Sequence, residues 1–179
     1  FTLNDGMECR YADVRKFGKM YLLDKKTANI EEPLKSLGYE FDDSRLTKEY
    51  LKEKFAKKNL PIKTVLLDQT IIAGIGNIYD DEILFLSKLS PLAKAKTLSL
   101  DQCNSIIQNT KLVLEKAIAK GGTTIRSYTS EEGVHGRFQN ELLVHGKKDE
   151  LCPICHTKIQ KMKVNGRGTY YCPNCQKEK

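Results

Sequence analysis

The middle of the chain has apolar residues at helical spacing, whereas both ends alternate in a way typical of strands. In residues 47–58, Leu51 and Phe55 stand one turn apart, and the threonine that begins this segment can cap a helix. The longest amphipathic segment starts with a capping box at Ser99-Leu100-Asp101-Gln102 and stops at Gly121-Gly122. These signals predict two helices separated by about forty residues.

Two shorter helices are expected between them. Pro61 suits the first turn of a helix, and the apolar stretch that follows is interrupted by Gly74-Ile75-Gly76. Helical spacing resumes after Asn77. We therefore predict a domain of about four helices over residues 46–137, which ends in a polar loop over residues 122–137.

The beginning of the chain reads as a fragment of a sheet. Residues 1–23 contain short alternating runs, a turn signal at Asp5-Gly6 and a last run at 17–23. A few strands are marginal alone, so partner strands are expected elsewhere. The chain opens on a strand and has no initiator methionine, which suggests a piece of a longer protein. Residues 24–45 are polar and are predicted to be a linker.

The end of the chain carries two Cys-x-x-Cys pairs. A segment with hairpin character separates them, with Asn165-Gly166-Arg167-Gly168 at its tip. Two such pairs at this spacing predict one tetrahedral, four-thiolate Zn²⁺ site, which leaves no coordination position for a substrate. We expect a zinc ribbon over residues 138–179, with a structural zinc held by Cys152, Cys155, Cys172 and Cys175.

The predicted fold class is mostly α with small β parts. Composition adds a class of partner and a compartment. The formal net charge is +7, and a filled four-thiolate site lowers it to about +5, which still favours a polyanion. An ordinary basic protein is the alternative. Cys9 and Cys103 are expected to be buried free thiols in a reducing cytoplasm. No apolar run reaches the length of a membrane span.

Asn77 is the first candidate for a contact with a polyanion. It follows two glycines and precedes a helix, where free N–H groups favour an anion such as a phosphate of a nucleic acid. The alternative is that Asn77 merely caps the helix and that Asp80, Asp81 and Glu82 complement the helix dipole. Three nearby lysines support a phosphate contact. They are Lys57, Lys58 and Lys63.

Arg167 is the second candidate, because the hairpin turn directs its side chain outward. Lys161 and Lys163 are expected on one strand face beneath it. A solvated basic hairpin is the alternative. Arg15 and Phe17 could form a cation and an aromatic wedge if they lie on a loop, although an ordinary strand is the simpler interpretation. The residues alone thus predict a zinc-stabilised binder of duplex DNA or RNA and no reaction.

Several of these motifs resemble one known family. Leu66-Leu67-Asp68-Gln69 and Ala73-Gly74-Ile75-Gly76-Asn77-Ile78-Tyr79 resemble the helix–two-turn–helix of the formamidopyrimidine-DNA glycosylase and endonuclease VIII family. Phe138-Gln139-Asn140-Glu141-Leu142, the Cys pairs and Gly166-Arg167-Gly168-Thr169 resemble its zinc finger. Asp13-Val14-Arg15-Lys16-Phe17-Gly18 and Gly121-Gly122-Thr123-Thr124-Ile125-Arg126 are similar to its bacterial formamidopyrimidine branch.

The resemblance implies base-excision repair of oxidised purines, chiefly 8-oxoguanine and formamidopyrimidines, with cleavage of the abasic strand by β,δ-elimination. The damaged nucleotide would be everted, and an N-terminal proline amine would attack C1′ of the sugar. Residues 1–23 would be a remnant of the N-terminal β-sandwich. The implied partner is double-stranded DNA with oxidised purines or abasic sites, bound by a monomer at the bacterial nucleoid.

The resemblance also implies roles for individual residues. Arg15 and Phe17 would fill and wedge the gap left by the everted base. The phosphates around the lesion would be held by Lys58, Lys63, Asn77 and Arg167. Arg167 would also assist the second elimination. A loop would close over the everted base, and it comprises Thr123, Thr124, Ile125, Arg126, Ser127 and Tyr128.

The chain departs from the family pattern at its beginning. Phe1 stands where the catalytic proline is expected, and the catalytic lysine of the sheet domain is missing too, so we expect no chemistry from these residues alone. Tyr39, His145 and His156 replace residues that are common in the family and are expected to be tolerated. A different class of function, a non-catalytic zinc-ribbon module that binds nucleic acid, is the alternative.

Overall fold

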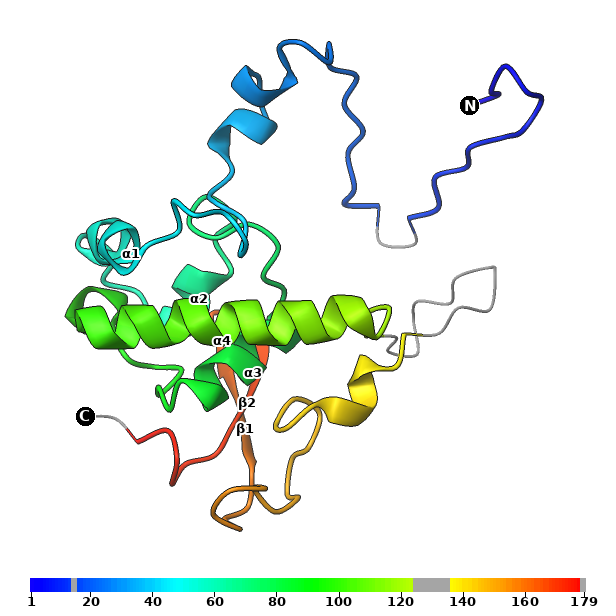
Figure 1. Ribbon diagram of the computed structural model, residues 1–179. Coiled ribbons are helices and arrows are strands. Elements are labelled where there is room, and N and C mark those ends of the chain that lie inside the picture. The colour runs from blue at the N-terminus through cyan, green and yellow to red at the C-terminus, as the bar shows by residue number, and fades with distance from the viewer. Residues whose placement is uncertain (14–15, 124–135, 178–179) are drawn as a thin grey trace. The chain divides into compact units, whose positions relative to one another are not determined.

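The computed structural model describes residues 1–13, 16–123 and 136–177 (Figure 1). The chain divides into two compact units, Phe1–Lys35 and Ser36–Lys179. The second unit contains the helical domain and the zinc ribbon, and the described part of the chain has no helix that is both long enough and apolar enough to cross a membrane.

The first unit contains less strand structure than the sequence predicts. Thr2 and Glu8 form an antiparallel bridge around a turn in which Gly6 has φ +82°, as the Asp5-Gly6 signal indicates. The expected strand at 17–23 is wrong, since none of these residues is in a strand and Phe17 is 76% exposed. A strand needs a neighbouring strand for its backbone hydrogen bonds, and the described residues of this unit provide none for that segment.

The predicted linker is divided between the two units. Its first half contains a short 3₁₀ helix, η1 (Ala28–Ile30), and a second one, η2 (Leu34–Ser36), reaches the boundary. Its second half packs on the helical domain, where Tyr39 forms a parallel bridge with Ile72. The compact unit therefore begins at Ser36, before the predicted boundary at residue 46.

The helical domain contains the four predicted helices. They are α1 (Lys48–Phe55), α2 (Ile62–Leu66), α3 (Asn77–Leu86) and α4 (Leu100–Ala119), with the 3₁₀ helix η3 (Ala95–Thr97) before α4. Thr47 Oγ1 accepts the Tyr50 N–H at 3.1 Å, and both hydrogen bonds of the predicted capping box before α4 are present. The caps thus form as the sequence predicts.

One continuous apolar core holds these helices together. Helix α4 packs against α1 and α3, as Figure 1 shows. Leu51 and Phe55 are fully buried, as the spacing predicts, and so is Cys103. Cys9 is exposed, which contradicts the prediction for that thiol, because none of the described residues of its unit is buried.

The zinc ribbon is a hairpin with a small core of its own. Its 3₁₀ entry is η4 (Phe138–Glu141), and its strands β1 (Gln160–Val164) and β2 (Arg167–Tyr171) pair antiparallel, with Val164 opposite Arg167. The turn residues Asn165 and Gly166 have φ +46° and +76°, the left-handed conformations that a two-residue type I′ turn requires. The turn predicted from Asn-Gly is confirmed.

Candidate nucleic-acid interface and metal centre

The four predicted cysteines converge on one point. Their Sγ atoms all lie within 4.8 Å of one another, with Cys152 to Cys175 at 3.9 Å and Cys155 to Cys172 at 3.4 Å. Four thiolates around one zinc at about 2.3 Å leave sulfur atoms about 3.8 Å apart, so the geometry fits one structural Zn²⁺. His156 lies outside this set and is exposed.

The thiols themselves favour a cation between them. Hydrogen bonds from Thr157 and Asn174 lower the pKa of Cys155 to about 5. Burial first, and then the neighbouring thiols, raise the pKa of Cys175. A divalent ion bound by all four groups offsets the repulsion between their negative charges and keeps all four thiols deprotonated. The centre is therefore structural, because four protein ligands complete its coordination.

The end of the ribbon that carries the cysteine pairs packs on the C-terminal half of α3. Phe85 of α3 is fully buried and joins the ribbon core with Val144, Ile159 and two of the cysteines. Gln176 accepts the Cys172 N–H at 2.9 Å and donates to the Leu89 carbonyl, also at 2.9 Å. This end is thus attached to α3 by apolar packing and to the segment just after α3 by a buried amide.

Glu82 fixes the segment that leads into the ribbon. Its carboxylate accepts three successive backbone N–H groups, from Leu143, Val144 and His145, at 2.7, 3.0 and 2.8 Å. Burial raises the pKa of Glu82, and these three hydrogen bonds oppose that rise. The side chain acts as an anchor for backbone, in contrast to the exposed dipole partner that the sequence suggests.

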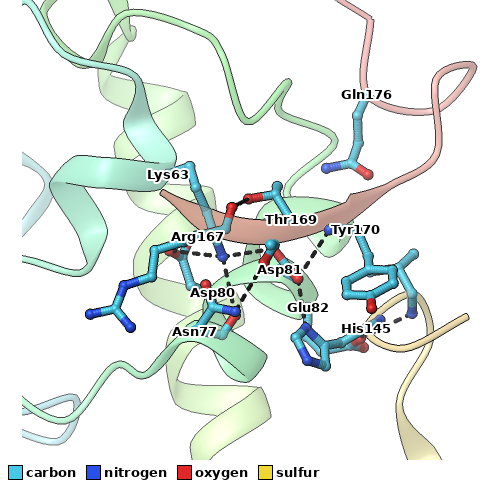
Figure 2. A network of polar contacts seen from close by, with 12 residues as sticks. Lys63, Asn77, Asp80, Asp81, Glu82, His145, Arg167, Thr169, Tyr170 and Gln176 are labelled. Carbon is cyan, nitrogen blue, oxygen red and sulfur yellow. Dashed lines mark hydrogen bonds and ion pairs between the residues drawn. The ribbon is translucent and has the colours of Figure 1, made fainter. Parts of the chain in front are cut away.

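Lys63 and Asp81 form a buried ion pair in the same region (Figure 2). The Lys63 ammonium is fully buried, 2.7 Å from Asp81 Oδ1 and 3.1 Å from the Asn77 carbonyl oxygen. It also lies 3.3 Å from Asp80 Oδ2. The prediction that Lys63 contacts a phosphate is therefore wrong for this structure, since its charge is directed into the protein.

Asn77 connects the helical domain to the tip of the ribbon. It is the first residue of α3, and Gly76 occupies the cap position, so the alternative of Asn77 as the cap is wrong. Its Nδ2 donates to the Gly168 carbonyl oxygen at 3.0 Å, one residue after Arg167. The N-terminus of α3 and the hairpin turn, two candidates found separately in the sequence, therefore lie side by side.

The Arg167 side chain is exposed and extends away from the buried polar groups (Figure 2). Beside it lies an open pocket of about 200 Å³ between α2 and the turn. The pocket is lined by Thr64, Leu67, Asp68, Val164, Asn165 and Arg167. Because Arg167 pairs with Val164, Lys161 and Lys163 lie on the other face of the hairpin, which corrects the expectation that they lie beneath Arg167.

Lys58 lies near the same pocket, because it forms an ion pair with Asp68, which lines that pocket. Its Nζ is 3.1 Å from Asp68 Oδ2, and the lysine side chain is 39% exposed. Burial tends to raise the pKa of Asp68, but hydrogen bonds from Thr70 and the Lys58 charge outweigh it and leave the pKa lowered. Lys58 and Arg167 thus provide two cations near one opening.

The structure does not place Arg15, Phe17 or Thr124–Tyr128 relative to this site. Arg15 and Thr124–Tyr128 lie outside the described residues. Phe17 belongs to the first compact unit, whose position relative to the second is not defined. Thr123 is described, and its hydroxyl lies 3.2 Å from the Tyr79 hydroxyl, two residues beyond Asn77 on α3.

Sequence reasoning missed the buried polar residues that join α3 to the ribbon. Asp80, Asp81 and Glu82 are all buried, although the sequence suggests only that they complement the helix dipole. A partial signal existed, because three consecutive residues span about 200° of a helix circumference, which is more than half of it. His145 carried no such signal, and its imidazole lies 2.6 Å from Asp81.

Comparisons with known proteins agree with both parts of this site. Residues 37–129 match the family model "Formamidopyrimidine-DNA glycosylase H2TH domain". Residues 149–177 match the model "Zinc finger found in FPG and IleRS". The first match alone covers more than half of the chain.

Individual relatives extend the similarity over nearly the whole chain. A formamidopyrimidine-DNA glycosylase of Bacillus cereus (strain ATCC 10987) is 46% identical over 98% of this chain and 64% of its own length. The chain thus spans slightly less than two thirds of the length of that relative. The solved complex of Lactococcus lactis Fpg with abasic-site DNA has a TM-score of 0.85 and 40% identity, covering 94% of this chain and 62% of that one. A MutM complex with DNA containing carbocyclic 8-oxo-G has a TM-score of 0.84, 40% identity and coverages of 94% and 61%.

Proposed function

The chain belongs to the formamidopyrimidine-DNA glycosylase family, and on that premise we propose that it is the damaged-DNA-binding part of a bifunctional glycosylase and AP lyase. Within the complete protein, the substrates are oxidised purines, namely 8-oxoguanine and formamidopyrimidines. The abasic strand is then cleaved by β,δ-elimination. The nucleic-acid partner is duplex DNA, bound by a monomer at the bacterial chromosome.

One observation carries the DNA-binding part of the proposal. The hydrogen bond from Asn77 to the Gly168 carbonyl places a helix N-terminus beside the turn that presents Arg167. Backbone N–H groups at a helix start and an exposed guanidinium are both ordinary phosphate ligands, and here they are adjacent. Lys58 adds a cation next to Asp68 on the same side. The printed titles of two similar structures name abasic-site DNA and 8-oxo-G DNA as bound partners of those proteins.

The other roles follow family membership. Arg15 and Phe17 fill and wedge the gap left by an everted base. The loop from Thr123 to Tyr128 covers that base, and the Tyr79 hydroxyl beside Thr123 gives the loop a fixed starting point. Arg167 holds a phosphate and assists the second elimination.

The phosphate role is tested with Arg167→Ala and a duplex that contains an abasic-site analogue. We expect binding to weaken on all sequences and the slope of log K against log salt to fall by about 0.9, the value for one lost phosphate contact. Lys158→Ala is the matched control. It removes the same charge from an exposed position at the far end of the hairpin, so its slope should stay at that of the unchanged chain.

An Arg167→Ala chain with unchanged affinity and slope contradicts the phosphate role. The catalytic part is tested on the complete protein with an 8-oxoguanine duplex, where base release and strand cleavage are expected. Binding without release would instead favour a non-catalytic module.

A further inference from the structure

Asp81 occupies a position where three segments meet. Its Oδ1 accepts from Lys63 Nζ of α2 at 2.7 Å. Its Oδ2 accepts from the Tyr170 N–H of β2 at 3.1 Å and from His145 Nδ1 at 2.6 Å. The side chain is fully buried, so all of these contacts are shielded from solvent. One carboxylate therefore joins α2, α3, β2 and the segment that enters the ribbon.

These contacts form a closed ring beneath the turn that carries Arg167 (Figure 2). Lys63, held by Asp81, donates to the Asn77 carbonyl oxygen at 3.1 Å. The Asn77 amide donates to the Gly168 carbonyl oxygen, and two residues later Tyr170 donates its N–H back to Asp81. Both Asn77 and Tyr170, near the end of β2, are thus fixed relative to the same side chain.

The two ends of the hairpin are held by different means. The end with the cysteines is attached by the zinc, by Phe85 and by Gln176. The tip, where Arg167 stands, is held on α3 by the Asn77 contact at Gly168, and Asp81 holds β2 three residues beyond Arg167, at Tyr170. A two-stranded hairpin is marginal alone, so its tip keeps one orientation only when such contacts hold it. The tip orientation therefore depends on Asp81.

We propose that Asp81 is a positioning residue for DNA binding: it holds the ribbon tip on α3 so that Arg167 and Asn77 contact the same stretch of phosphate backbone. The inference rests on the proposed function. Asp81 touches no DNA in this arrangement and acts through Arg167. Binding energy is then not spent on ordering the hairpin, which is the usual benefit of a preorganised site.

The test is Asp81→Asn in the 179-residue chain, with an abasic-site analogue duplex over a range of potassium chloride concentrations. We expect about tenfold weaker binding and a salt slope reduced by about one phosphate contact. The direction is informative, because removing a negative charge would by itself tighten binding to DNA. Zinc content and the helical circular dichroism of the variant should match those of the unchanged chain.

Asp80→Asn is the matched control. Asp80 is adjacent and equally buried, but among the described residues its only close polar contact is the Lys63 ammonium, 3.3 Å from Oδ2, and it makes no hydrogen bond to β2 or to the segment that enters the ribbon. Its affinity and salt slope should equal those of the unchanged chain or show slightly tighter binding. A loss equal to that of Asp81→Asn would show that any buried carboxyl group here matters, and would overturn the specific role.

A double-mutant cycle separates positioning from a general structural effect. In an Arg167→Ala background, Asp81→Asn should cost much less than it does alone, because the Arg167 contact that it positions is already removed. An undiminished cost in that background contradicts the proposal, as does wild-type affinity and slope for Asp81→Asn alone. If the unchanged chain binds no duplex, the proposed function itself fails. This result is distinguishable from the two that contradict the role of Asp81, because in both of those the unchanged chain binds DNA.

His145→Phe keeps the test decisive if Asp81→Asn does not fold. It removes one of the three Asp81 contacts and keeps an aromatic ring against Tyr170, whose ring centroid is 4.9 Å from that of His145. We expect about threefold weaker binding with zinc retained. Unchanged affinity in this variant would overturn the proposal.

Discussion

The helical domain and the zinc ribbon share helix α3 but are stabilised in different ways. The helical domain has one continuous core of buried side chains drawn from all four helices. The ribbon core contains five buried residues, and two of them, Cys152 and Cys172, are predicted zinc ligands. Phe85 comes from α3, so the ribbon itself contributes even less apolar surface.

This difference assigns distinct tasks to the two regions. Apolar burial is non-directional and gives the helical domain its stability, whereas a metal and buried hydrogen bonds define positions more closely. The ribbon needs a defined position, because it presents Arg167 on a hairpin that is too small to be stable alone. The side of α3 that faces the ribbon therefore carries Asp81 and Glu82 where an ordinary helix would carry apolar residues.

Zinc removal should give the largest difference between the two regions, because it should unfold the ribbon and leave the helical domain folded. Structural zinc contributes about 10–16 kcal/mol of apparent binding energy in small modules, which exceeds what the ribbon core can supply. After chelation we expect the helical circular dichroism to persist, while Tyr170 and Tyr171 become accessible and DNA affinity is lost. Limited proteolysis and DNA titration of the metal-free chain, with zinc content measured, check this. Retained DNA affinity in verified metal-free protein contradicts the prediction.

A matched pair of phenylalanine substitutions tests the same contrast at the level of one side chain. Phe55 and Phe85 are both fully buried, one in each core. Each change to alanine should lower the free energy of unfolding of its region by about 3–5 kcal/mol.

The two variants should differ in zinc retention. Phe85→Ala should release zinc to a chelator faster than the unchanged chain does, because its loss opens the ribbon core. Phe55→Ala should lower the thermal midpoint and leave the rate of zinc release near that of the unchanged chain. Equal rates of zinc release from the two variants would show that the cores are one cooperative unit.

Features that depend on neighbouring residues were predictable from the sequence. The Thr47 cap, the capping box before α4 and the Asn165-Gly166 turn all form as expected, because each is decided by a few adjacent residues. The four cysteines also converge, since two Cys-x-x-Cys pairs permit few other arrangements. Local chemistry therefore fixed most elements and the metal centre.

Features that depend on distant segments were not predictable in the same way. Lys63 reads as one of several surface lysines, and only the fold reveals that Asp81, eighteen residues later, pairs with its ammonium. The strand expected at 17–23 did not form, because pairing requires a neighbour that sequence spacing cannot supply. The contact between Asn77 and Gly168 spans ninety-one residues and has no local signature.

The smallest expected effect concerns Asp80, which lies on α3 between the two regions. Burial is the main reason that its pKa lies well above the ordinary value of 3.8, and the Lys63 charge opposes this only in part. The folded state therefore keeps a proton that the unfolded chain has already lost. Between the two pKa values, the stability contribution of this group should fall by about 1.4 kcal/mol per pH unit as pH rises.

Asp80→Asn isolates that contribution, because it removes the titration and leaves the raised pKa of Glu82 in both proteins. Urea unfolding of the two chains from about pH 4 upward should give a stability difference that grows with pH in favour of the variant and then levels off. A constant difference would mean that Asp80 is ionised in the folded protein throughout, with Lys63 shared equally by the two aspartates. The contrast between the two regions would then be larger, since α3 would hold two buried negative charges next to the ribbon with only one ammonium, that of Lys63, to balance them.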